Sequence, residues 1–70
     1  MTDWTPAEYE AVLIPAEVAA QHGVEARGTI VDIPHGARAA TVECTRLGGR
    51  RGLDTNLVDL PFEALTPVAD

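Results

Sequence analysis

The sequence contains no lysine, a single cysteine and only three aromatic residues. These shortages reduce the number of structural and functional classes to which the protein can belong. One thiol, that of Cys44, provides neither an internal disulfide nor a cysteine-rich zinc site, so we expect a protein of the reducing cytoplasm. Apolar runs are a few residues long, far short of a membrane span. The first ten residues are acidic, without a basic stretch followed by an apolar one, so we also expect no signal peptide.

Cations are also scarce: five arginines face eleven carboxylates, giving a formal net charge of −6. An acidic chain is repelled by phosphate backbones, which disfavours nucleic acid as a partner. The same charge favours a basic protein partner, because complementary charge accelerates association. The simpler explanation, which we weigh above a binding role, is that the charge keeps a small protein in solution.

The length of 70 residues allows one domain, which we place at residues 9–70 behind an N-terminal extension of residues 1–8. A chain of this size buries only about 60% of the surface that its unfolded form exposes, so its stability is marginal. Much of the 46% hydrophobic content is alanine, which contributes little burial. We therefore expect the core to consist of valine, leucine and isoleucine together with Phe62.

Two helix signals precede the first clear strand. Residues 5–8 have a capping residue, a proline and a glutamate at capping-box spacing, which predicts one helical turn followed by a strand. The alternative is a strand over residues 9–14, with Val12 and Ile14 on one face. Residues 15–23 begin with proline and end with Gly23, which predicts a short helix within a long loop.

From Gly28 onward the pattern is that of β-strands. Residues 28–33 are rich in β-branched side chains, and residues 39–45 alternate so that Ala40, Val42 and Cys44 share one face. Turn residues lie at 34–36 and at 47–52, where three glycines supply positive φ angles. Alternation then slips in the strand expected over residues 53–60, which predicts a bulge near Asn56.

Residues 60–65 predict a tight 3-10 turn, and residues 66–68 a short closing strand. The count is five short strands with turn signals at nearly regular spacing, a helical turn in the first long loop and a sharp bend at Gly28. This pattern predicts an all-β fold, a small five-stranded SH3-like barrel.

Four segments resemble a family of small bacterial proteins that are predicted to be SH3-like barrels: residues 11–13 (Ala-Val-Leu), 28–31 (Gly-Thr-Ile-Val), 42–44 (Val-Glu-Cys) and 60–68. The resemblance covers residues 9–68. The chain departs from the family pattern at residues 25–27, where a glycine is usual, and at Cys44, where an aromatic residue is frequent. The family implies the barrel but no activity. Similar proteins often look like one half of a gene pair with a toxin-like neighbour, which implies an antitoxin-like role.

The most charged turn carries Arg46, Arg50 and Arg51, with Asp54 close by in the sequence. Three arginines on a glycine-rich tip suit phosphate or carboxylate binding, and Asp54 is placed to pair with one of them. A solvated loop on an acidic protein is the alternative that we prefer. Nucleic-acid binding through this tip remains a further alternative.

Trp4 and Tyr9 lie before the barrel, where aromatic residues either anchor a partner or cover an open end of the core. The two roles are balanced for Trp4, and packing is favoured for Tyr9. With few other aromatics, a groove for proline-rich peptides is not expected.

The sequence does not indicate a cluster of side chains suited to catalysis. His22 and His35 fall in expected turns, and Cys44 shares a face with apolar residues, so we predict a small buried hydrophobe rather than a nucleophile. The spacing of these three residues matches no metal site. We therefore expect no enzyme, no cofactor and no metal.

The leading hypothesis is a cytoplasmic, non-enzymatic protein-binding module, antitoxin- or inhibitor-like, that neutralises a basic or toxin-like partner. Trp4, Arg46, Arg50, Arg51 and Asp54 are the candidate partner-binding residues. The alternative is an accessory or structural barrel that packs on a larger enzyme or self-associates, so the chain is expected as a monomer or a small homo-oligomer.

Overall fold

The computed structural model describes residues 4–68, which form a five-stranded antiparallel sheet with a short helix and a 3-10 turn. The strands are β1 (Ala11–Leu13), β2 (Val24–Asp32), β3 (Ala39–Arg46), β4 (Thr55–Pro61) and β5 (Thr66–Pro67). The helix α1 (Ala16–His22) follows β1, and the 3-10 turn η1 (Phe62–Ala64) precedes β5. The expected β fold, with a helical turn in the first long loop and a 3-10 turn before the last strand, is confirmed.

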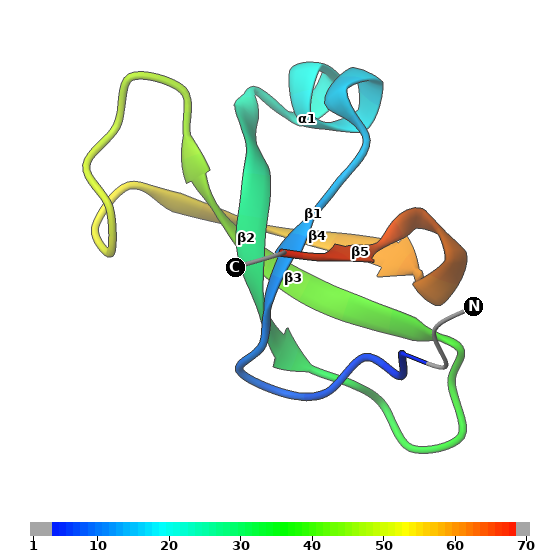
Figure 1. Cartoon of the computed structure of the whole chain (residues 1–70). Coiled ribbons are helices and arrows are strands. Elements are labelled where there is room, and N and C mark those ends of the chain that lie inside the picture. Colours follow the sequence, from blue (N-terminus) through cyan, green and yellow to red (C-terminus); the bar gives the residue numbers. More distant parts are fainter. Residues whose placement is uncertain (1–3, 69–70) are drawn as a thin grey trace.

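The order of strands in the sheet is β4-β3-β2-β1-β5. β2 is the longest strand and pairs with β1 on one side and β3 on the other. Figure 1 shows that β3 and β4 run across the direction of β2, so the sheet is strongly twisted. Within residues 4–68 the sheet is open, with β4 and β5 at its edges, and no pairing between these two strands closes it into a barrel.

The irregularity that curves the sheet lies in β2. Its register against β3 shifts between Val24 and Gly28 and again between Ile30 and Asp32, which agrees with the bend expected at Gly28. The bulge expected near Asn56 is wrong, because the pairing of β3 with β4 continues unbroken from one end to the other. The apparent slip in alternation arises because residue 53 belongs to the preceding turn and the strand begins only at residue 55.

The N-terminal segment does not form the expected capping box. Residues 4–7 are irregular and Glu8 and Tyr9 form a turn, with Tyr9 at a φ of 67°. The backbone N–H of Tyr9 donates to the carbonyl of Ile30 at 2.6 Å, and the N–H of Ile30 donates to the carbonyl of Glu10 at 3.0 Å. Pairing with β2 therefore begins before β1 itself, and the strand alternative is the better description of residues 9–14.

The predicted helix at residues 15–23 is confirmed as α1. It ends at Gly23, whose φ of 66° is the left-handed conformation that glycine adopts without strain. Nothing helical in residues 4–68 is both long and apolar enough to traverse a bilayer.

The core lies on one face of the curled sheet, with Ala19 of α1 added to it, and consists, as expected, mainly of aliphatic side chains. Its members are Val12, Ile14, Ala19, Val24, Ile30, Ala40, Val42, Cys44, Val58, Leu60 and Leu65. Phe62, expected in the core, is only partly buried and packs against its rim, as does Trp4. No buried side-chain nitrogen or oxygen in the described residues lacks a hydrogen-bond partner. The inner face is thus a sealed apolar layer, and polar chemistry is confined to the other face and the loops.

Candidate functional site on the outer face of the sheet

The outer face of the sheet is the side opposite the core, and its side chains come from four adjacent strands. The register places Ala11, Thr29, Glu43 and Leu57 in one row from β1 to β4. Successive residues of a strand point to opposite faces. The residues next to this row along the strands point into the core, so the row itself points to the outer face. Leu57, at the β4 end of the row, is 63% exposed. This row therefore combines a hydroxyl group and a carboxylate with an exposed leucine.

The turn between β3 and β4, residues 47–54, is organised by Asp54. Its Oδ2 accepts a hydrogen bond from the backbone N–H of Arg50 at 2.8 Å, and its Oδ1 accepts one from the guanidinium of Arg46 at 3.4 Å. The Nε of Arg50 lies 3.9 Å from Oδ2. The pairing of Asp54 with an arginine that the sequence suggested is present. Two of the three clustered arginines are thereby directed at Asp54 within the turn.

The three glycines let this turn fold tightly, but not all of them supply the positive φ angle that was expected. Gly48 and Gly52 have positive φ angles of 78°, whereas Gly49 does not. A Cβ on Gly49 would lie 2.6 Å from the Cβ of Asp54, so this glycine leaves room for the carboxylate. The turn is consequently ordered by these contacts, although most of its residues are exposed, as expected of a solvated loop.

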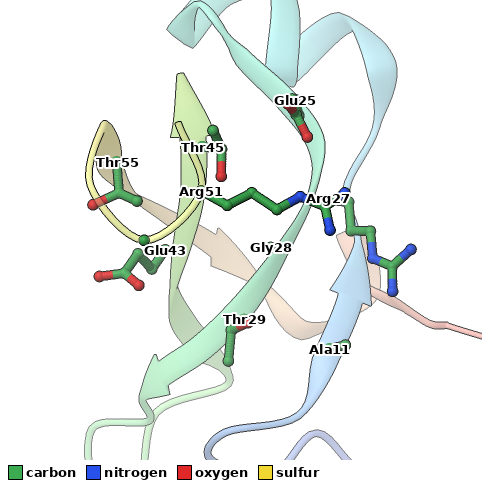
Figure 2. A pocket seen from close by; sticks show the side chains of 10 residues that line it. Ala11, Glu25, Arg27, Gly28, Thr29, Glu43, Thr45, Arg51 and Thr55 are labelled. Atoms are coloured by element: carbon green, nitrogen blue, oxygen red, sulfur yellow. The ribbon is translucent and has the colours of Figure 1, made fainter. Parts of the chain in front are cut away.

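Arg51 leaves this cluster and lines a groove of about 340 Å³ on the outer face. Figure 2 shows its side chain extended from the turn across β2, above Gly28 and toward Arg27. Thr29, Thr45 and Thr55 also line the groove. Two carboxylates, those of Glu25 and Glu43, complete the polar lining. The groove thus offers guanidinium, hydroxyl and carboxylate groups in one place.

Arg27 was missed by the sequence analysis, because the strand was expected to begin only at Gly28. β2 begins four residues earlier, at Val24, which is buried. Counting alternate residues outward from Val24 would have placed Glu25 and Arg27 on the outer face. The signal was the isolated Val24 after the helix stop, which is too short a pattern to define a strand alone.

Trp4 lies at the opposite end of the molecule and has a packing role. It is half-buried against the core rim, and its Nε1–H donates to the Oε2 of Glu10 at 2.9 Å. The N–H of Ala7 donates to the other oxygen of the same carboxylate at 3.2 Å. The packing role expected for Tyr9 is wrong, since Tyr9 is 78% exposed after its turn directs the side chain outward. Partner binding by Trp4 stays a prediction.

A second groove, of about 380 Å³, lies beside Trp4. Phe62, Pro6 and Arg38 line it with Trp4, so its surface is more apolar than that of the first groove. It is separate from the arginine cluster on which the sequence analysis concentrated. The structure therefore does not bring all five candidate residues into one site.

The groups considered for catalysis are spread over different surroundings. Cys44 is fully buried, as expected, while His22 and His35 are exposed. Burial, and to a lesser degree the charge of Glu43, raises the pKa of the Cys44 thiol above its ordinary value of 9.0. Within residues 4–68 no three His, Cys, Asp or Glu side chains are grouped so that they could hold a metal ion. The histidines and the thiol do not line the groove on the outer face.

No protein-family model, no curated protein and no solved structure matches the chain, so the family resemblance stays a prediction.

Proposed function

We propose that the chain is a non-enzymatic protein-binding module of the SH3-like kind that binds a basic partner through the outer face and free edge of β4. The strand order supports the SH3-like assignment, because the three strands β2, β3 and β4 follow one another as a meander and the last strand returns beside the first. A long, irregular β2 shared by both halves is what a small coiled sheet requires.

The observation that carries the proposal is the exposure of Leu57 on an edge strand. β4 pairs only with β3, so its other edge leaves backbone N–H and C=O groups without a strand partner within residues 4–68. Such an edge accepts an extended segment by strand addition, in which backbone hydrogen bonds provide affinity and side-chain contacts provide specificity. A segment added there lies beside Leu57, which supplies the apolar contact.

The charge of this region favours a basic segment. Glu43 is paired in register with Leu57, and Asp59 lies on the same face of β4. Both carboxylates are exposed, although Asp59 accepts a hydrogen bond from the hydroxyl of Thr41 at 2.6 Å. A segment that carries lysine or arginine on this face would gain both the ion pairs and faster association with a chain of net charge −6.

The family resemblance implies a specific biological role for such a module: an antitoxin- or inhibitor-like protein of the bacterial cytoplasm. Covering a functional surface of a basic partner requires no catalytic group on this chain. The free thiol of Cys44 is consistent with a reducing compartment. Self-association through β4 is the second candidate, because the same free edge would pair with its copy.

The test uses an eight-residue peptide in which lysine alternates with valine, and a matched peptide with glutamate in place of lysine. We expect the lysine peptide to shift the amide resonances of β4 and the glutamate peptide to leave them unchanged. Leu57→Ala should weaken binding about tenfold or more, because burial of a leucine contributes about 1.5–3 kcal/mol. Leu53→Ala is the control, since Leu53 is 68% exposed but lies in the turn.

Two outcomes would contradict this assignment. Equal binding of both peptides, or full binding by Leu57→Ala, removes the role of this face. A dimer in light scattering that Leu57→Ala dissociates, together with no peptide binding, would establish self-association instead.

A further inference from the structure

Arg27 and Arg51 line the same groove of an acidic protein, and neither forms an ion pair with a carboxylate of residues 4–68. Among residues 4–68, ion pairs within 4 Å are formed only by Arg46 and Arg50, both with Asp54. Arg27 and Arg51 are exposed and extend into the groove from different elements, β2 and the β3–β4 turn. Two like charges that share a groove repel each other, and an anion between them would attract both and offset that repulsion.

Arg51 is held in place by the structure of the turn. The N–H groups of Leu53 and Asp54 both donate to the carbonyl of Arg50, at 3.1 and 2.9 Å. Asp54 in turn accepts the backbone N–H of Arg50 at 2.8 Å. These bonds fix the backbone on both sides of Arg51, so its side chain starts from a defined position above β2 (Figure 2). Because this backbone is already ordered, binding of an anion by Arg51 does not have to order the turn.

We propose that this groove binds a small phosphate monoester through the paired guanidiniums of Arg27 and Arg51. Guanidinium groups bind phosphate oxygens through two parallel hydrogen bonds, and two such groups match the dianionic charge. The hydroxyls of Thr29, Thr45 and Thr55 add donors around the same space. The groove volume of about 340 Å³ lies at the lower end of the range for small-molecule sites, which suits a compact ligand.

The carboxylates in the groove narrow the ligand class further. Glu25 and Glu43 would repel a bare anion, but they accept hydrogen bonds from hydroxyl or amino groups. An ester that carries donors beyond its phosphate satisfies both halves of the lining, with the phosphate toward the arginines and the donors toward the glutamates. This site rests on Arg27 and Arg51 and does not require the proposed strand addition at β4, although Glu43 borders both.

The test is a titration followed by amide and arginine side-chain resonances at low salt and about pH 7.5, where a phosphate monoester is a dianion because its second pKa is about 6. The ligands are glycerol 3-phosphate, inorganic phosphate and acetate. We expect saturable shifts at Gly28, Thr29 and Arg51 with a Kd of about 1–10 mM for the ester. Inorganic phosphate should bind more weakly, and acetate should not saturate.

Variants distinguish a built site from general attraction to cations. Arg27→Gln and Arg51→Gln should each weaken binding about tenfold, since each removes one charge-assisted pair of hydrogen bonds. Arg38→Gln removes the same charge from the other groove and should change the Kd by less than about twofold. Glu43→Gln should strengthen the binding of inorganic phosphate, because it removes a repulsive charge.

The proposal is overturned if the shifts do not saturate, or if Arg38→Gln weakens binding as much as Arg51→Gln does. It is also overturned if acetate binds as well as the ester, which would leave only a nonspecific cationic surface. Circular dichroism of each variant establishes that it is folded, and peptide binding at β4 is measured separately, so failure of one proposal is not mistaken for failure of the other.

Discussion

The two faces of β3 have opposite character, one buried and apolar, the other polar and open to solvent. On the inner face Ala40, Val42 and Cys44 are at most 1% exposed and contact the core. On the outer face, Glu43 and Thr45 line an open groove. The same backbone therefore serves two purposes. Packing dictates the inner residues, whereas no packing requirement explains why two arginines, two glutamates and several threonines gather on the outer face.

The core on the inner face contains few large side chains, so a single substitution there removes a large share of the stability. Its largest fully buried side chains are Ile30, Val12, Val24, Val42 and Val58, and both large aromatics near it lie at the rim. A core made of β-branched side chains fits closely and tolerates changes in shape poorly. The outer face consists of exposed or half-exposed residues, so substitutions there should change binding while leaving stability almost unaltered.

The strongest test of this contrast is Gly28→Ala. A Cβ at this position would lie 2.6 Å from the carbonyl oxygen of Glu43, 2.6 Å from a methyl of Val42 and 2.8 Å from the sulfur of Cys44. Real Cβ atoms do not approach so closely, so the paired strands β2 and β3 would have to move apart, and Val42 and Cys44 would have to repack. We expect a loss of about 3 kcal/mol in the free energy of unfolding, typical of overpacking a small core. Urea denaturation measures it.

Thr29→Ala is the matched control for that variant. It changes the next residue of β2, which points to the outer face, and should cost less than about 0.5 kcal/mol. A Gly28→Ala protein as stable as the control would show that the two strands are not held at this separation.

The sequence was informative wherever a local pattern decided the structure. The alternation of β3, the glycine stop of α1 and the Leu-Pro turn before β5 all follow from neighbouring residues, and all three are present. The start of β2 was not predictable in this way. Glu25, Ala26 and Arg27 have no strong strand preference. They become strand because Arg27 pairs with Leu13 of β1 and because the pairing with β3 resumes on either side of them, at Val24 and Gly28.

The candidate site could be predicted only in part, because some of its residues meet through strand pairing between distant segments of the chain. The arginine cluster and its pairing with Asp54 involve residues close together in the chain. Arg27 joins Arg51 only through sheet register, and Trp4 meets Glu10 only because the N-terminal segment follows β2 and forgoes a helical turn. Whether a sheet closes into a barrel also depends on the pairing of its edge strands, which the spacing of turns in the sequence does not determine.

Asp54→Ala gives an intermediate effect and tests whether the turn on the outer side contributes to stability. The variant removes the acceptor for the backbone N–H of Arg50 and both ion pairs. The site is partly exposed and water replaces some of these bonds, so we expect a loss of about 1 kcal/mol. Urea denaturation measures the loss. Asp59→Ala, which removes one exposed hydrogen bond to Thr41, should cost less; equal losses would mean that Asp54 does not organise the turn.

The smallest effect concerns the titration of Cys44 and shows how completely the inner face excludes water. Because burial raises the pKa of this thiol in the folded chain above its ordinary value of 9.0, the unfolded chain loses the proton first as pH rises. Ionisation then stabilises the unfolded state, so the free energy of unfolding should fall as pH rises above about 9. From pH 7 to about pH 9.5 the free energy of unfolding should therefore fall more than it does in Cys44→Ala, which has no thiol. Parallel pH profiles for the two proteins would contradict a sealed inner face, as would rapid alkylation of Cys44 in the folded chain.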